Sequence, residues 1–166
     1  MKGMIVFSYA LRDEEPNLCN VRLAKAVFRI VDELDEPIVL VSQRTVLLAL
    51  RQLGAPVAKI HVVEKRLGEY EGSEEVVKQA TEVFLERRIT EVIPVAQPFL
   101  QLTKCVQLVR KAGFRTPSFW KLCRMIGWIG FDPKSKQPGT RGPVRSVLYT
   151  IRQMLFGYRP PPELSE

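Results

Sequence analysis

Short apolar runs that alternate with amphipathic stretches restrict the fold of this chain more than any other feature of its sequence. Residues of β-forming type gather at 4–10, 37–42, 58–64 and 91–96, and a fifth such run lies at 114–121. Each of the first four runs is followed by apolar residues at helical spacing. Strands that alternate with helices form right-handed βαβ units. The pattern therefore predicts an α/β fold with helices on both faces of a mostly parallel, roughly five-stranded sheet, whose fifth strand lies at an edge.

The amphipathic stretches also carry signals for where helices begin and end. Asn20 and Ser73 are expected as N-caps, because their short polar side chains can accept from the free N–H groups of a first turn. Gly54 and Gly113 follow apolar stretches and are expected to end helices. The predicted helices span residues 18–34, 43–54, 73–88, 99–113 and 144–158.

The length and composition predict one domain. The chain has 166 residues, and 46% of them are hydrophobic, which suits a single globular core. We expect this domain to span residues 1–158 and to be followed by a flexible tail at 159–166, where three prolines stand in a row. No apolar run approaches the length of a membrane span, and the N-terminal segment becomes acidic too early for a secretory signal. These features predict a cytoplasmic protein.

The residues that usually carry catalysis or bind metals are sparse. The three cysteines are far apart in the sequence and form no CxxC motif, so neither a zinc site nor a disulfide framework is predicted. The single histidine, His61, lies inside an apolar run, where a structural role is favoured. A Ser-His-Asp triad would need that histidine and a serine presented beside it, and no loop supplies one. No catalytic residue is assigned, and whether the protein is an enzyme stays open.

Basic residues are concentrated in the last third of the chain. Residues 101–166 hold 12 Lys and Arg against 3 Asp and Glu, whereas residues 1–100 hold 13 against 15. This surface could attract nucleic acid or an anionic membrane surface, and Phe119, Trp120 and Trp128 would add aromatic contacts. A basic segment without a recognition motif is equally compatible with a merely solvated face.

Ligands of parallel α/β sheets bind beyond the carboxyl ends of the strands. The polar residues that follow the predicted strands are therefore candidates for a binding site. At 131–143 a long polar loop with three Pro and two Gly is of the kind that closes over a ligand, and its Arg141 would clamp an anion. One of the four glutamates of the loop at 68–75 could bind a ribose hydroxyl, an amine or a metal, although acids at a helix start also have a simple electrostatic role.

The order of these segments resembles the DUF218 family, also called the YdcF-like or SanA/ElyC-like family. The segments that carry the resemblance are the Arg22-bearing first helix, VSQ at 41–43, GSEE at 72–75, PVAQPFLQLTKC at 94–105 and FDPKSKQPGTR at 131–141. The resemblance implies a Rossmann-like three-layer sandwich of the soluble branch. It also implies S-adenosylmethionine or another nucleotide-like molecule as the ligand.

The chain departs from the family pattern at the loop after the fourth strand. There the family carries a His followed by an Arg, whereas this chain offers Gln97, Gln101 and Lys104. A Gln side chain exchanges hydrogen bonds but no proton near neutral pH, so this loop suits binding better than acid–base work. We therefore predict that a nucleotide-like or phosphorylated small molecule binds at the strand ends. The residues predicted to line that site are Arg12, Ser42, Arg44, Glu74, Gln97, Gln101, Lys104 and Arg141. The alternative is a non-catalytic protein that binds nucleic acid or an anionic surface through its basic C-terminal third.

Overall fold

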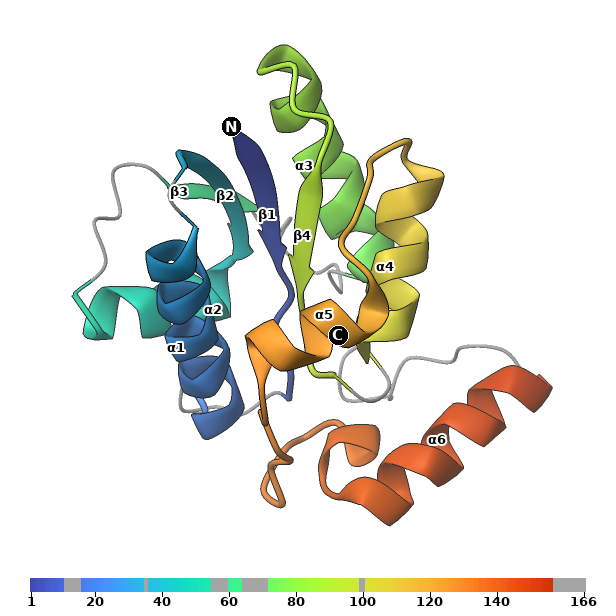
Figure 1. Cartoon of the computed structure of the whole chain (residues 1–166). Coiled ribbons are helices and arrows are strands. Elements are labelled where there is room, and N and C mark those ends of the chain that lie inside the picture. Colours follow the sequence, from blue (N-terminus) through green and yellow to red (C-terminus); the bar gives the residue numbers. More distant parts are fainter. Residues whose placement is uncertain (11–15, 35, 55–59, 64–71, 99–100, 157–166) are drawn as a thin grey trace.

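The computed structural model describes residues 1–10, 16–34, 36–54, 60–63, 72–98 and 101–156. In that part of the chain a parallel sheet is surrounded by helices (Figure 1). The strands are β1 (Lys2–Val6), β2 (Ile38–Gln43), β3 (Ile60–Val63) and β4 (Val92–Val95), and the helices are α1 (Leu18–Glu33), α2 (Arg44–Gln52), α3 (Ser73–Glu86), α4 (Gln101–Lys111), α5 (Phe119–Ile126), the 3₁₀ turn η2 (Pro138–Thr140) and α6 (Pro143–Phe156).

The sheet has the order β3-β2-β1-β4, and every neighbouring pair is parallel. β1 lies in the centre, because Ile5 is opposite Val41 of β2 and also opposite Pro94 of β4. All four residues of β4 are buried, as expected for a strand covered on both faces. The α/β class and the parallel sheet are confirmed.

The predicted fifth strand was wrong for the described residues. Only one isolated bridge, between Glu91 and Arg115, continues the sheet beyond β4. In that bridge the Val92 N–H donates to the Arg115 carbonyl at 2.8 Å. The chain turns into α5 soon afterwards, because Pro117 is followed by Ser118, whose hydroxyl accepts from the Lys121 N–H as the N-cap. Within the described part of the chain the sheet therefore has four strands, where roughly five were predicted.

The helices lie on both sides of the sheet. α1 and α2 pack against each other on one side, where α5 also contacts α1, and α3 and α4 pack on the other (Figure 1). α1, α2, α3 and α4 bury the apolar stripes that their spacing predicted, as Leu23 and Ile30 do in α1 and Val76 and Phe84 do in α3, whereas α6 leaves apolar residues exposed. Among the described residues, no helix combines the length and apolar character that a membrane crossing requires.

Two predicted helix caps were displaced. The N-cap of α1 is Asn17, whose side-chain oxygen accepts from the Asn20 N–H at 3.0 Å, so Asn20 lies inside the first turn. The N-cap of α3 is Gly72 rather than Ser73, and no side chain caps that helix. At the start of α1 the sequence offers two asparagines three positions apart, and either could begin a helix. Both asparagines are buried, and the Asn20 side chain accepts from the Tyr9 N–H instead of capping the helix.

The loop at 131–143 is ordered by its own hydrogen bonds. The Asp132 N–H donates to the Thr140 carbonyl at 2.9 Å, and the Thr140 hydroxyl donates to the Ser135 hydroxyl at 2.6 Å. η2 closes the loop and packs against α6. In Figure 1, α6 lies at the end of the molecule toward which the segments after β1 and β4 run. The tail predicted at 159–166 lies outside the described residues.

Candidate functional site

The order in which the strands are added to the sheet reverses its direction at β1. β2 and β3 follow on one side of β1, and β4 lies on the other side. The helix that follows β1, α1, lies on one side of the sheet, and the helix that follows β4, α4, lies on the other (Figure 1). The two connections diverge at their start, and in open α/β sheets this divergence leaves a crevice at the carboxyl edge. The carboxyl edge between β1 and β4 is therefore the candidate site.

Two glutamine side chains hold the segment that follows β1. The Gln43 side-chain oxygen accepts from the Ser8 N–H at 2.6 Å and from the Ser8 hydroxyl at 2.9 Å. From the other side, the Gln101 side-chain NH₂ group donates to the Ser8 carbonyl at 2.7 Å. Gln43 ends β2 and Gln101 begins α4, so three separate segments of the chain are tied together at Ser8. We call Ser8, Gln43, Gln97 and Gln101 the amide cluster.

Gln97 completes the amide cluster after β4. Its backbone N–H donates to the Gln101 side-chain oxygen at 3.2 Å, and its carbonyl accepts from the Leu102 N–H at 3.0 Å. Gln97 is fully buried. The structure thus brings together Gln97 and Gln101, two of the predicted site residues, through the turn that joins β4 to α4.

Ser42 and Arg44 lie beside this cluster in different environments. Ser42 is fully buried, and its hydroxyl donates to the Gln43 carbonyl at 3.1 Å, so it supports the backbone of the β2–α2 turn. Arg44 begins α2 and is exposed. The N-cap of that helix is Gln43, and because its side chain is turned toward Ser8, it makes no capping hydrogen bond.

Glu74 and Lys104 meet at the same ends of their helices. The Lys104 Nζ lies 3.7 Å from a carboxylate oxygen of Glu74, which joins the first turn of α3 to the first turn of α4. Both side chains are exposed, so this ion pair contributes little to stability. The two residues are nevertheless placed together on the solvent side of α4's start, one helical turn beyond Gln101.

The two remaining predicted site residues are Arg141 and Arg12. The Arg141 guanidinium donates to the Ser135 carbonyl at 2.5 Å and to the Lys136 carbonyl at 3.5 Å, and so it closes its own loop. Its role as an anion clamp stays a prediction. Arg12 lies outside the described residues.

Sequence reasoning placed Tyr9 after the first strand but did not predict the second polar group that forms around it at this edge. The Tyr9 N–H donates to the Asn20 side chain at 2.9 Å, and the Asn17 side chain donates to the Ala10 carbonyl at 3.0 Å. Ala10 has a φ of 65°, a left-handed conformation that these bonds help to hold. Burial raises the pKa of Tyr9 to about 12, and the Ser146 side chain of α6 partly opposes this rise. The sequence signal that could have predicted this polar group is the pair of asparagines, Asn17 and Asn20, at the start of the first helix.

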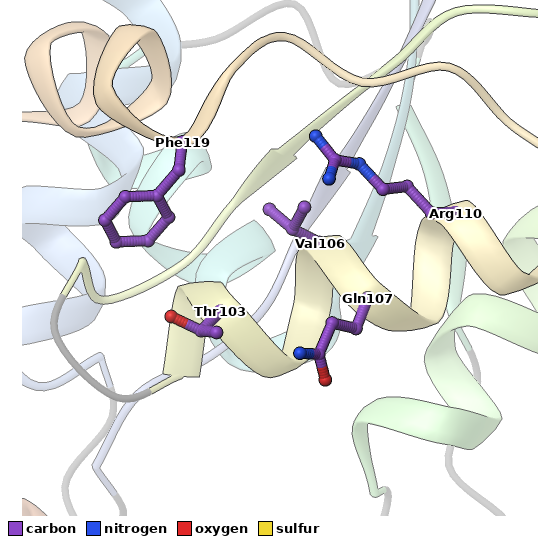
Figure 2. A pocket seen from close by; sticks show the side chains of 5 residues that line it. All are labelled: Thr103, Val106, Gln107, Arg110 and Phe119. Carbon is purple, nitrogen blue, oxygen red and sulfur yellow. The ribbon is translucent and has the colours of Figure 1, made fainter.

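A shallow groove of about 290 Å³ lies elsewhere, between α4 and the start of α5 (Figure 2). Its lining residues are Thr103, Val106, Gln107, Arg110 and Phe119. Helical spacing places them on the side of α4 opposite Gln101, so the groove is not part of the amide cluster. The Arg110 guanidinium donates to the Thr116 hydroxyl at 2.8 Å, which ties α4 to the segment before α5.

The described residues offer no metal-ligand cluster. No three His, Cys, Asp or Glu side chains gather within that part of the chain. Burial raises the pKa of Cys105 to about 12, which keeps this thiol protonated. The amide cluster itself can donate and accept hydrogen bonds but cannot transfer a proton near neutral pH. Its chemistry is that of binding.

Comparison with known proteins adds no further constraint. No protein-family model matches the chain, and no curated protein matches it.

Proposed function

We propose that the protein is a Rossmann-like, DUF218-type binding protein for a nucleotide-like or phosphorylated small molecule. The ligand would lie at the carboxyl edge of the sheet, between β1 and β4. The observation that carries the proposal is the strand order β3-β2-β1-β4, because its reversal falls where the amide cluster lies. The sequence resemblance suggests the same edge.

The amide cluster suits recognition of a polar ring or ribose. Gln43 and Gln101 each carry a donor and an acceptor on one planar group, and a nucleobase or sugar presents both kinds of partner. Their contacts to Ser8 fix these amides before a ligand arrives, which lowers the entropic cost of binding. Glu74 adds a carboxylate that can accept from a ribose hydroxyl.

The exposed cations near the cluster suit a phosphate. Arg44 follows Gln43 directly at the start of α2, and Lys104 lies one turn after Gln101. A phosphate there would meet the N–H groups of a helix start together with a side-chain cation. Lys104 is already paired with Glu74, so a phosphate would compete with this carboxylate for the ammonium group.

Thermal unfolding with added ligands tests the proposal. The panel contains ATP, GTP, UDP-glucose, glucose 6-phosphate and S-adenosylmethionine, because a ligand that binds only the native state must raise Tm. A phosphorylated ligand should raise Tm of the parent protein and shift that of Lys104→Ala less. Lys111→Ala is the matched control, since it removes a lysine from the last turn of the same helix.

The alternatives within the panel are distinguishable. S-adenosylmethionine has no phosphate, so its shift should depend on Gln101 and not on Lys104. If a phosphorylated ligand shifts Tm equally in Lys104→Ala and Lys111→Ala, the ligand binds away from the amide cluster. The absence of any shift across the panel would overturn the proposal.

A further inference from the structure

The final helix, α6, presents apolar side chains to solvent. Val144, Val147, Leu148 and Ile151 are spaced at i, i+3, i+4 and i+7, so they share one face of the helix. Their exposed fractions are 71, 51, 60 and 48%. We call these four residues the α6 stripe. It is a continuous apolar surface on one helix, unlike the scattered exposed side chains of ordinary surfaces.

The opposite face of α6, described at Ser146 and Tyr149 near its start, is polar and faces the protein. Ser146 is 4% exposed, and its side chain interacts with Tyr9, which follows β1. Tyr149 packs against η2 so closely that a Cβ on Gly139 would lie 2.6 Å from its ring. A surface helix normally buries its apolar face and exposes its polar one. α6 does the reverse, because its inner side packs against η2 and meets Tyr9 through Ser146.

The charge of α6 is entirely positive. Arg145 and Arg152 lie on one border of the α6 stripe, and residues 143–156 contain no Asp or Glu. Both arginines are exposed. Across residues 101–162 the sole acidic residue is Asp132. A partner for this surface must therefore accept an apolar stripe and offer negative charge beside it.

We propose that α6 binds in the plane of an anionic lipid surface. The α6 stripe would enter the boundary between headgroups and acyl chains, and Arg145 and Arg152 would contact the acidic headgroups. An apolar stripe with arginines on its border has the composition of an interfacial helix. The carboxyl edge of the sheet would then face the membrane through α6.

Two other partners fit this surface less well. A second copy of the chain would bring another α6 with two arginines and no acidic residue, so their charges would repel each other. Nucleic acid is bound by cations together with stacking aromatic side chains, and the α6 stripe consists of Val, Leu and Ile alone. Neither partner accounts for the apolar and the basic parts together.

Co-sedimentation of the full chain with vesicles tests the proposal. The vesicles contain phosphatidylcholine alone or phosphatidylcholine with 30 mol% phosphatidylserine. We expect the parent protein to bind the anionic vesicles. The double variant Leu148→Ser, Ile151→Ser should bind them roughly ten-fold or more weakly. Leu85→Ser is the matched control, because Leu85 is equally exposed on α3. Arg145→Glu should weaken binding by about five-fold or more, and Lys78→Glu on α3 should not.

The remaining outcomes overturn the proposal. Failure to bind anionic vesicles would do so, as would binding that Leu148→Ser, Ile151→Ser leaves intact. A concentration-dependent dimer that this variant dissociates would assign the α6 stripe to a second copy. Salt-sensitive binding to RNA or DNA without vesicle binding would assign the basic residues to nucleic acid. All substituted positions are exposed, so unchanged circular dichroism separates each result from misfolding.

Discussion

The Gln101 side chain donates a hydrogen bond to the Ser8 carbonyl across 2.7 Å, and this bond ties the start of α4 to the segment after β1. The two residues are 93 positions apart in the sequence. Through this bond, the helix that follows β4 meets the chain that follows β1 at the candidate site. The amide cluster therefore links β2, α4 and the segment after β1, in addition to being the candidate binding site.

Gln101→Ala should destabilise the protein by about 1–3 kcal/mol, because it leaves the partly buried Ser8 carbonyl and the Gln97 N–H without their partner. Urea unfolding of the two proteins measures the difference. Gln107→Ala, on the exposed side of the same helix, should change stability by less than about 0.5 kcal/mol. Equal losses in the two variants would contradict the role assigned to Gln101.

Gly3→Ala should cost about 1–3 kcal/mol of stability, because an added Cβ would lie 2.9 Å from the tip of the Phe84 ring. Both residues are buried in the core between β1 and α3. A smaller side chain at 84 should relieve this clash. Chemical denaturation should therefore show that Gly3→Ala costs less in a Phe84→Leu background than in the parent, and additive losses would argue against the close packing.

The ion pair between Lys2 and Glu36 should make stability depend on pH at both extremes. The hydrogen bond from Lys2, 2.8 Å long, lowers the Glu36 pKa below its ordinary value of 4.5 and, in return, raises the Lys2 pKa above 10.5. The carboxylate's contribution is complete above pH 4.5 and is lost as the pH falls through the lowered pKa. The ammonium's contribution is complete below pH 10.5 and is lost as the pH rises through the raised pKa.

Glu36→Gln should therefore lower Tm by a small amount between about pH 5 and pH 10, and the difference should shrink outside this window. Thermal unfolding measured at a series of pH values checks this. Because the pair lies near the surface, the difference should also shrink in 1 M salt. A difference that grows below pH 4 would have the wrong sign for this interaction.

The three thiols should react in a defined order. Cys19 and Cys105 are buried, and burial raises the Cys105 pKa to about 12, whereas Cys123 is partly exposed. At pH 8 a thiol reagent should label Cys123 first, and slowly, since burial raises its pKa as well. Mass spectrometry of the labelled peptides identifies the order. Labelling of Cys105 at the rate of Cys123 in native protein would contradict the burial of α4.

Local patterns predicted the elements of the fold well. The apolar run at 37–42 became β2 at Ile38–Gln43, and the stretch at 73–88 became α3 at Ser73–Glu86. The run at 114–121 failed because Pro117 and the Ser118 cap turn the chain into α5 after a single bridge at Arg115. Residue type alone does not predict whether a β-forming segment will pair with a neighbouring strand.

The candidate site was harder to predict, because its contacts are long-range. Gln97 and Gln101 were recognised from their place after a strand, whereas Gln43 was placed after the second strand but was not predicted as a site residue. Its hydrogen bonds to Ser8, 35 positions away, depend on β1 and β2 lying side by side. The sequence also did not predict that the apolar face of α6 is exposed. Helical periodicity identifies an apolar face, but it does not show whether that face points toward the core or toward solvent.

Pro94 affects whether the β4 edge of the sheet can pair with a strand of another molecule of this protein. In β4, Val92 donates outward to Arg115, so the nitrogen of Pro94, two positions later, also points outward, and it carries no hydrogen. A strand from another molecule that tried to extend the sheet there would find a gap in the row of donors. This border of the sheet is thereby protected against fibril growth and strand exchange in a crowded solution.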